Sequence, residues 1–241
     1  MACDKPPASF GIQNGLWRVK FPIAACVIFL FTAPTQAAWF AARDGLLMLR
    51  GAIEMGDAHA LATRLKADPG LRVLRLDSYG GSVKGAIELG EIVRRAKLTT
   101  LVDASRDVCD SACTMIFAAG VARHYLNAEA MTEGFSGQAG LGYHRSYMRG
   151  DRVTPPTLSD EGERLMMAYY RKMGAKAAVA LARRGTISSF WRPNGPTALR
   201  LGLATSLAAP APAARGLSPS SPRISGSPAR ASASSRTSPA N

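Results

Sequence analysis

A single serine lies between two cysteines in the middle of the chain, at the start of a short apolar segment. Residues 108–120 read VCDSACTMIFAAG, so that Cys109 and Cys113 flank Ser111. A serine hydroxyl is a weak nucleophile until a base takes its proton, and it needs N–H donors beside the carbonyl that it attacks. The apolar segment predicts a helix that begins at Ser111, and the first N–H groups of a helix are free donors. Ser111 is therefore a candidate nucleophile.

Two other short segments have the residue types that such a serine needs. Residues 76–83, LDSYGGSV, place two glycines directly after a predicted strand, where the lack of side chains lets the backbone approach a substrate. His144, in the segment LGYH, is a candidate general base. We interpret the three segments as nucleophile, oxyanion-binding turn and base. The alternatives are that Ser111 only caps a helix and that His144 only packs in the core.

In this order the motifs resemble the Clp-type proteolytic subunits and the related signal-peptide peptidases of the crotonase superfamily. The glycine segment resembles the N-S-P-G-G-S-V turn of that family, and DSAC at 110–113 lies where its nucleophilic serine lies. GYH at 142–144 resembles its I-H histidine, and ALRLGLA at 198–204 resembles its A-x-x-Y-G-L-x segment. Arg123 matches a basic residue that follows the serine helix, and the resemblance covers about residues 46–205.

The resemblance implies a mechanism, a fold and a set of partners. Ser111 is the nucleophile and His144 the base, and the N–H groups of Gly81 and Ala112 form the oxyanion hole. The reaction is acyl transfer, in which an acyl-enzyme forms on the serine and is then hydrolysed. The implied fold is the α/β spiral of the crotonase superfamily, like that of Clp proteases. The implied partners are a peptide or protein substrate and further copies of the chain in a homo-oligomer, with no cofactor.

The third member of a catalytic triad is missing from its place in the family. Clp subunits have an aspartate shortly before the A-x-x-Y-G-L segment, whereas residues 187–194, ISSFWRPN, contain no acid. Loss of that carboxylate lowers the rate by orders of magnitude. A catalytically degenerate protein that binds peptides or acts as a scaffold is therefore the alternative function, and a Ser-His dyad is the alternative mechanism. The candidates to orient His144 are Ser188, Ser189, Asn194 and Asp160.

The residues near the glycine turn leave two further mechanisms open. Lys84 follows the turn closely and would be the base if the chain resembled the signal-peptide peptidases, which use a lysine. Crotonase-type chemistry on acyl thioesters is less well supported, because no glutamate lies at the turn or at the Ser111 helix. An exported protein would also not meet coenzyme A.

The first 37 residues predict a secretory signal. Arg18 and Lys20 precede an apolar run at 21–33, and Thr35-Gln36-Ala37 offers small residues for cleavage. The run is shorter than the roughly 20 residues that cross a bilayer, and an uncleaved membrane anchor is the alternative. We therefore expect an exported protein that is periplasmic, or anchored through residues 21–33 and facing the periplasm. With this leader, the cysteine-flanked Ser-Ala-Cys motif more closely resembles an exported branch of the Clp/crotonase superfamily.

The cysteines, histidines and charge bear on compartment and ligands. Only Cys109 and Cys113 follow the leader, and in an exported protein they either pair or remain two buried thiols. The three histidines have no Cys, Asp or Glu at ligand spacing, which predicts no metal site. The net charge of +13 includes Arg18 and Lys20 in the leader and four arginines in the tail, and no nucleic-acid motif accompanies it. We expect no nucleic-acid partner.

Hydrophobic periodicity predicts alternating strands and helices in a domain at 38–207. The predicted strands are 46–49, 71–76, 98–102 and a short one at 141–144, and the predicted helices are 58–65 with Asp57 as its cap, 83–96, 111–120, 159–174 and 175–184. Such alternation is typical of parallel β-α units with right-handed crossovers. Residues 208–241 are rich in Ala, Pro, Ser and Arg, and they predict a disordered tail.

Overall fold

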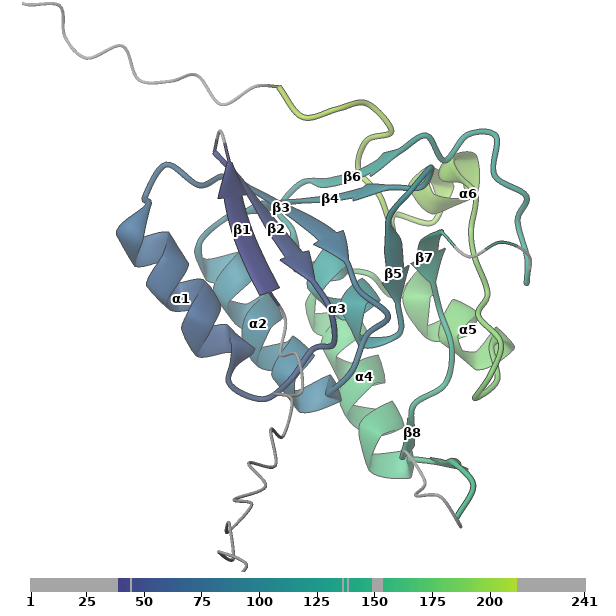
Figure 1. Cartoon of the computed structure of the whole chain (residues 1–241). Helices are drawn as coiled ribbons and strands as arrows, with labels where there is room; N and C mark the ends of the chain where they lie inside the picture. Colours follow the sequence, from purple (N-terminus) through teal and green to yellow (C-terminus); the bar gives the residue numbers. More distant parts are fainter. Residues whose placement is uncertain (1–38, 44, 136, 138, 149–153, 212–241) are drawn as a thin grey trace, which may run out of the picture. The chain divides into compact units, whose positions relative to one another are not determined.

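The main sheet of the computed structural model has five strands in the order β1-β2-β3-β4-β6, of which only the edge strand β1 is antiparallel to its neighbour (Figure 1). Leu47 lies opposite Leu74 and Leu49 opposite Leu76, and all four are fully buried. This register places apolar side chains of neighbouring strands on the same buried face. The strands are β1 (Trp39–Arg43), β2 (Leu46–Arg50), β3 (Val73–Asp77), β4 (Thr99–Asp103) and β6 (Arg123–Leu126).

Three helices lie on one face of this sheet (Figure 1). They are α1 (Asp57–Ala67), α2 (Val83–Arg95) and α3 (Ala112–Ala119). The buried positions of α2 recur every three or four residues, as the sequence predicts. Every residue of α3 is buried. α3 packs against the main sheet and against α4 (Asp160–Lys172), so the start of the helix has a fixed position.

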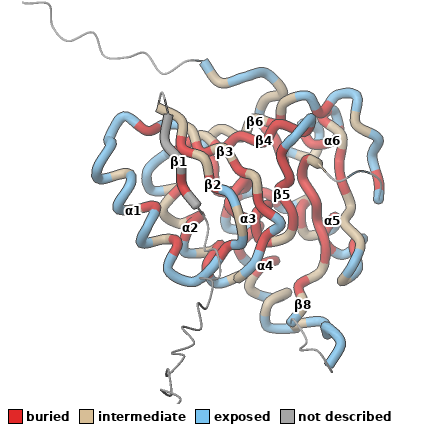
Figure 2. Tube along the Cα trace, in the orientation of Figure 1, coloured by how far each residue is buried: buried red, intermediate tan, exposed pale blue. Residues whose placement is uncertain are grey.

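A second, two-stranded sheet positions the candidate site. β5 (Val108–Asp110) pairs in parallel with β7 (Gly140–Gly142), and both strands are wholly buried. Figure 1 shows them crossing the direction of β4 and β6, and Figure 2 shows β5 among the buried parts. A short hairpin follows, formed by β8 (Tyr147–Met148) and β9 (Thr157–Leu158).

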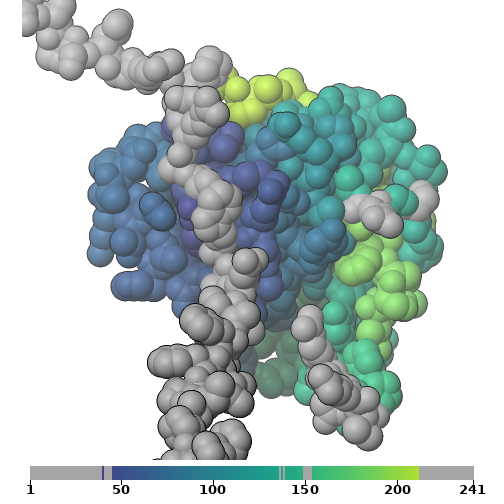
Figure 3. All heavy atoms as spheres, in the orientation of Figure 1, coloured from purple at the N-terminus to yellow at the C-terminus, as the bar shows by residue number. Residues whose placement is uncertain are grey.

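The last described segment packs back on the main sheet. α5 (Ala177–Arg184) and α6 (Gly195–Arg200) precede it. Arg123 donates from Nε to the Leu203 carbonyl at 2.8 Å and from Nη2 to the Gly202 carbonyl at 3.0 Å. Figure 3 shows this segment, in yellow, at the surface. Arg123 and the ALRLGLA motif at 198–204 are two of the features in which the sequence resembles the Clp-type subunits. These hydrogen bonds join the two features in the structure.

The structure describes residues 39–43, 45–135, 137, 139–148 and 154–211, which all belong to one compact unit. The α/β architecture of parallel β-α units is confirmed. The predicted leader at 1–37 and most of the predicted tail, 212–241, lie outside the described residues. Within the described ranges, every helix is too short or too polar to cross a bilayer.

Candidate active site

Ser111 lies at a sharp turn between β5 and α3. Its backbone has φ 56° and ψ −125°, a conformation that a residue with a side chain rarely adopts. Such strain costs about 1–3 kcal/mol and persists only where the surroundings enforce it. Here the Ser111 N–H donates to the Gly142 carbonyl at 2.9 Å, which extends the β5–β7 pairing by one bond. The strand, the buried helix and this bond together hold the turn.

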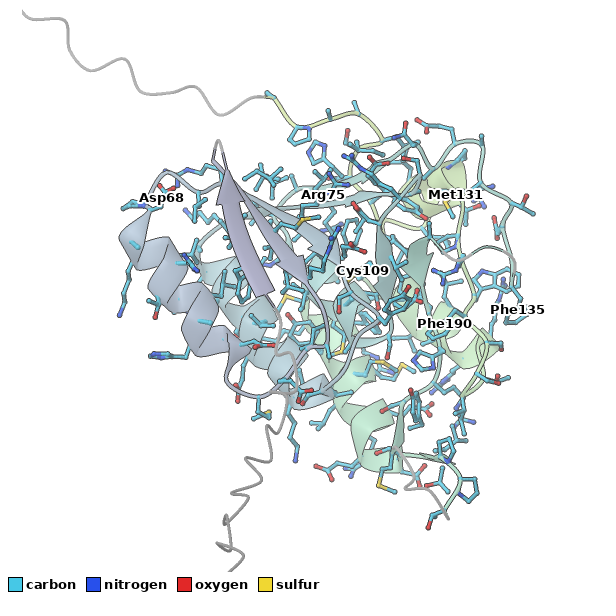
Figure 4. The ribbon with its side chains drawn as sticks, in the orientation of Figure 1. Asp68, Arg75, Cys109, Met131, Phe135 and Phe190 are labelled. Carbon is cyan, nitrogen blue, oxygen red and sulfur yellow. A yellow bond between two sulfur atoms is a disulfide. The ribbon has the colours of Figure 1, made fainter. Side chains whose placement is uncertain are left out.

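The disulfide Cys109–Cys113 closes across this turn. Cys109 lies in β5 and Cys113 in the first turn of α3, and both are fully buried. Figure 4 labels Cys109 at its place on β5. Because the bond joins the residues on both sides of Ser111, it restricts how far the turn can relax.

Removing the disulfide is expected to destabilise the fold and to slow any reaction of Ser111. For a loop of five residues, loss of the cross-link costs about 2 kcal/mol of unfolding free energy by the loop-entropy relation. The test is urea unfolding of the Cys109→Ala, Cys113→Ala double variant beside the unreduced protein. An unchanged midpoint and an unchanged slope would show that the bond restrains nothing.

The glycine turn after β3 lies against the Ser111 turn. Ser78 bridges Cys109: its N–H donates to the Val108 carbonyl at 2.6 Å, and its carbonyl accepts from Asp110 N–H at 3.0 Å. A Cβ on Gly80 would lie 2.8 Å from Ser111 Cβ and 3.0 Å from the Ala112 nitrogen. Only glycine therefore allows this approach.

Two backbone N–H groups near Ser111 remain available. Ala112 is the first residue of α3, where no intrahelical acceptor exists, and α3 has no side-chain cap. Gly81 forms a parallel bridge with Ile53 through the Gly80 carbonyl and the Ser82 N–H, so that its own N–H points away from Ile53. Among the described residues, neither N–H donates a hydrogen bond. Both are the residues expected to form the oxyanion hole.

His144 follows β7, two residues after Gly142. Gly142 pairs with Asp110, and its carbonyl accepts from Ser111 N–H. His144 is 2% exposed and packs between the rings of Tyr147 and Phe190, at 5.4 and 4.5 Å between centroids. Phe190 is labelled in Figure 4.

The two ring nitrogens of His144 have different surroundings. Nδ1 lies 3.2 Å from the Thr186 carbonyl, which can only accept, so Nδ1 carries the hydrogen and Nε2 is the acceptor. Nε2 is buried and has no hydrogen-bond partner among the described residues. No hydrogen bond joins it to Ser111 Oγ; such bonds often tighten only when substrate binds. A neutral imidazole with a free Nε2 has the protonation state of a general base.

A backbone carbonyl thus orients His144, and none of the four predicted side chains does so. Asn194 caps α6 by accepting from Thr197 N–H, and Ser189 is hydrogen-bonded to the Thr186 hydroxyl. Ser188 donates its own N–H to that hydroxyl, and Asp160 lines a separate cavity beside α4. A backbone carbonyl leaves no signal in residue types, so the sequence cannot predict this acceptor.

Gly185 lets the Thr186 carbonyl approach the His144 ring. A Cβ on Gly185 would lie 2.5 Å from the Tyr143 carbonyl oxygen and 2.8 Å from His144 Cβ. The sequence marks Gly185 only as the end of a helix. In the structure its missing side chain lets the segment that carries Thr186 close over the imidazole.

Burial lowers the pKa of His144 below its ordinary value, although hydrogen bonds to the Thr186 and Ile187 backbone oppose this. A general base works only when neutral, so the reaction of Ser111 is expected to persist below about pH 6.5, where an ordinary histidine would be half protonated. The same shift stabilises the fold above about pH 6.5, and this stability is lost as the pH falls through the folded-state pKa. The rate at which a fluorophosphonate labels Ser111, measured from pH 5 to 8, shows where the reaction falls off as His144 is protonated. A half-maximal rate at a pH above 6.5 would contradict His144 as the buried base.

Asp110 and Arg192 form a buried ion pair next to the nucleophile. Arg192 donates to both carboxylate oxygens, at 2.7 and 3.0 Å, and the two side chains are 3–4% exposed. Burial raises the pKa of the Asp110 carboxyl, and the guanidinium opposes this. Arg192 also donates to the Gly137 and Gly140 carbonyls. The pair therefore ties the residue before Ser111 to the segments around β7. Because 82 positions separate the partners, no pattern in the sequence predicts it.

Lys84 points elsewhere. Its ammonium pairs with Glu161 at 3.1 Å, and both side chains are more than 60% exposed. It is not among the residues that line the cavity at Ser111. His144 does not line it either, so the cavity does not distinguish the two candidate bases; the Lys84 ammonium, however, is already paired with a carboxylate.

A cavity of about 560 Å³ opens at Ser111, between the glycine turn, β8 and α4. A second cavity, of about 300 Å³, lies on the other side of Tyr79, which lines both and is 76% exposed. Phe135 and Phe190, labelled in Figure 4, line the second cavity. Within the described part of the chain, no three His, Cys, Asp or Glu side chains gather in a way that could hold a metal ion. The two cavities are large enough for amino-acid side chains on both sides of an attacked bond.

Comparison with known proteins gives similarity in structure only. No family model matches the sequence, and no curated protein matches it. A mutant of 1510-N, a membrane-bound stomatin-specific protease, is similar at 13% identity and a TM-score of 0.48, over 67% of this chain and 77% of that chain. Another mutant of it, in complex with a substrate peptide, gives 13% and 0.48 over 67% and 73%. The Clp protease catalytic domain from Plasmodium falciparum gives 14% and 0.46 over 68% and 85%. The likeness concerns the path of the chain alone.

Proposed function

We propose that the chain is an exported serine hydrolase that cleaves peptides by acyl transfer. The observation that supports this most is the strained Ser111 turn, which lines a cavity together with Gly81 and has the unused N–H groups of Gly81 and Ala112 beside it. The free Nε2 of the buried His144 is the base that we assign to it. These are the parts that such a reaction needs. The order of the motifs along the chain adds independent support.

In the proposed reaction His144 Nε2 takes the Ser111 proton as the oxygen attacks the substrate carbonyl. The oxyanion that develops is held by the N–H groups of Gly81 and Ala112. The protonated imidazole then gives its proton to the leaving amine, and an acyl-enzyme remains on Ser111. Water, deprotonated by the same nitrogen, releases the acid. The Thr186 carbonyl holds the ring orientation but carries no negative charge, so we expect a slower enzyme than one with a carboxylate there.

The second candidate is a protein of this fold that binds peptides without turnover. Two observations favour it: no hydrogen bond joins Ser111 to His144, and a carbonyl stands where the family has an acid. We also propose that the protein belongs to an exported branch of this superfamily and is either periplasmic or anchored in the membrane through residues 21–33. We propose further that it assembles into a homo-oligomer.

A pre-steady-state assay separates the two candidates. With a p-nitrophenyl ester of a short peptide, the enzyme should release about one equivalent of p-nitrophenol rapidly and then turn over slowly, because the acyl-enzyme accumulates. Ser111→Ala should show no burst. Binding of the corresponding peptide without any burst would refute the hydrolase and leave the binding protein.

A further inference from the structure

A groove lined by arginines lies on α4 and α5, away from the cavity at Ser111. Two hollows of about 410 and 420 Å³ share Arg145 and Arg183 in their linings and so adjoin. The green atoms of α4 and α5 reach the surface in Figure 3. We call this the arginine groove and define it by five residues: Arg145, Arg164, Arg171, Arg183 and Arg184.

The charges of the groove are only partly balanced. Glu163 accepts from Arg145 at 2.8 and 2.9 Å and lies 4.0 Å from Arg183. Arg164 and Arg171 have no carboxylate partner within the described ranges, and both are exposed. They are seven residues apart on α4, which places them on one face about two turns apart. Two free guanidinium groups at that spacing suit carboxylates on successive parts of an extended ligand.

The groove is connected to the candidate site by shared residues. Ser188 lines both the groove and the second cavity beside Tyr79, and Tyr79 in turn lines the cavity at Ser111. Thr186, whose carbonyl orients His144, also lines the groove. A chain that occupies the site can therefore follow adjoining hollows to the arginines.

We propose that the arginine groove binds an acidic segment of the peptide substrate, several residues from the attacked bond. This rests on the proposed peptide-binding function. A peptide fits better than a nucleic acid, because Trp191 beside the groove already packs against Arg184, at 4.7 Å over one ring face, and against the Phe135 ring, at 5.1 Å between centroids. The acids Asp160 and Glu163 inside the groove also oppose a continuous phosphate surface, whereas a peptide can place neutral side chains beside them.

The test measures binding to the full chain carrying Ser111→Ala, so that no turnover interferes. Two fluorescein-labelled peptides are compared by anisotropy at 0.05 and 0.15 M salt: one with four Asp or Glu residues on each side of the presumed cleavage position, and one with Asn and Gln there instead. The acidic peptide should bind at least tenfold more tightly, and the difference should shrink with salt. Equal affinities would overturn the proposal.

Paired charge reversals locate the effect. Arg164→Glu with Arg171→Glu should abolish the preference for the acidic peptide and leave the amide peptide unchanged. Arg64→Glu with Lys66→Glu, both exposed on α1, changes the net charge equally and should preserve the preference. If the α1 double variant loses the preference as the α4 double variant does, the preference reflects net charge, and the arginine groove is not where the acidic segment binds. Stronger binding of phosphatidylserine vesicles or single-stranded DNA than of the acidic peptide, lost in the α4 pair only, would also overturn it.

The result is independent of whether Ser111 reacts. Acid-dependent binding without a burst would retain the groove and refute the hydrolase. A burst of p-nitrophenol with equal binding of both peptides would retain the hydrolase and refute the arginine groove as a binding site.

Discussion

Replacing Arg192 by alanine is expected to lower the free energy of unfolding by about 3–5 kcal/mol. The reason is that the substitution leaves the Asp110 carboxylate buried without its partner, which costs more than the pair itself contributes. Urea unfolding followed by circular dichroism measures this. The loss should be accompanied by slower labelling of Ser111, because Asp110 directly precedes it.

Two controls show whether the buried charge is the cause. Asp110→Asn with Arg192→Met removes both charges at similar volume and should be less destabilising than Arg192→Ala alone. Arg50→Ala breaks a more exposed pair with Asp77 and should cost less than about 1 kcal/mol. If Arg192→Ala costs no more than Arg50→Ala, the ion pair does not hold the site together.

Replacing His144 by glutamine is expected to slow covalent labelling of Ser111 by about 10²–10⁴-fold, the usual contribution of a general base. Glutamine keeps a polar side chain of similar size in the buried position, so the fold should survive. Lys84→Ala, by contrast, should label at the wild-type rate because Lys84 pairs with Glu161 outside the cavity.

The rate constant for reaction with a fluorophosphonate, measured at pH 7.5, distinguishes the two bases. A fall with Lys84→Ala and none with His144→Gln would reverse the assignment. Thermal unfolding of both variants shows whether any fall reflects loss of the fold.

The elements with a clear apolar period could be predicted from the sequence. The predicted helices at 83–96 and 159–174 appear as α2 and α4, because one face of each repeats at helical spacing. The strands β5 and β6 were missed. β5 has only three residues, and β6 contains Arg123 and His124, whose partners come from the C-terminal segment that covers the strand.

Some residues of the candidate site could also be predicted from the sequence, and others could not. The strained turn at Ser111 and the glycine turn beside it could be predicted as unusual local backbone, and the roles of Ser111, Ala112 and Gly81 stay predictions. Arg192, Gly185 and Thr186 could not, because each acts on a residue more than 40 positions away. A search for an acid to orient His144 also assumed a side chain where the fold supplies a carbonyl.

The most direct test of the central claim is where a fluorophosphonate attaches to the chain. After reaction, tryptic digestion and mass spectrometry, the account predicts a single adduct on the disulfide-containing peptide, at Ser111. It predicts none in Ser111→Ala, with the Cys109–Cys113 bond intact in both proteins. An unlabelled wild-type protein, or equal labelling of Ser111→Ala, would contradict the claim that Ser111 is the nucleophile.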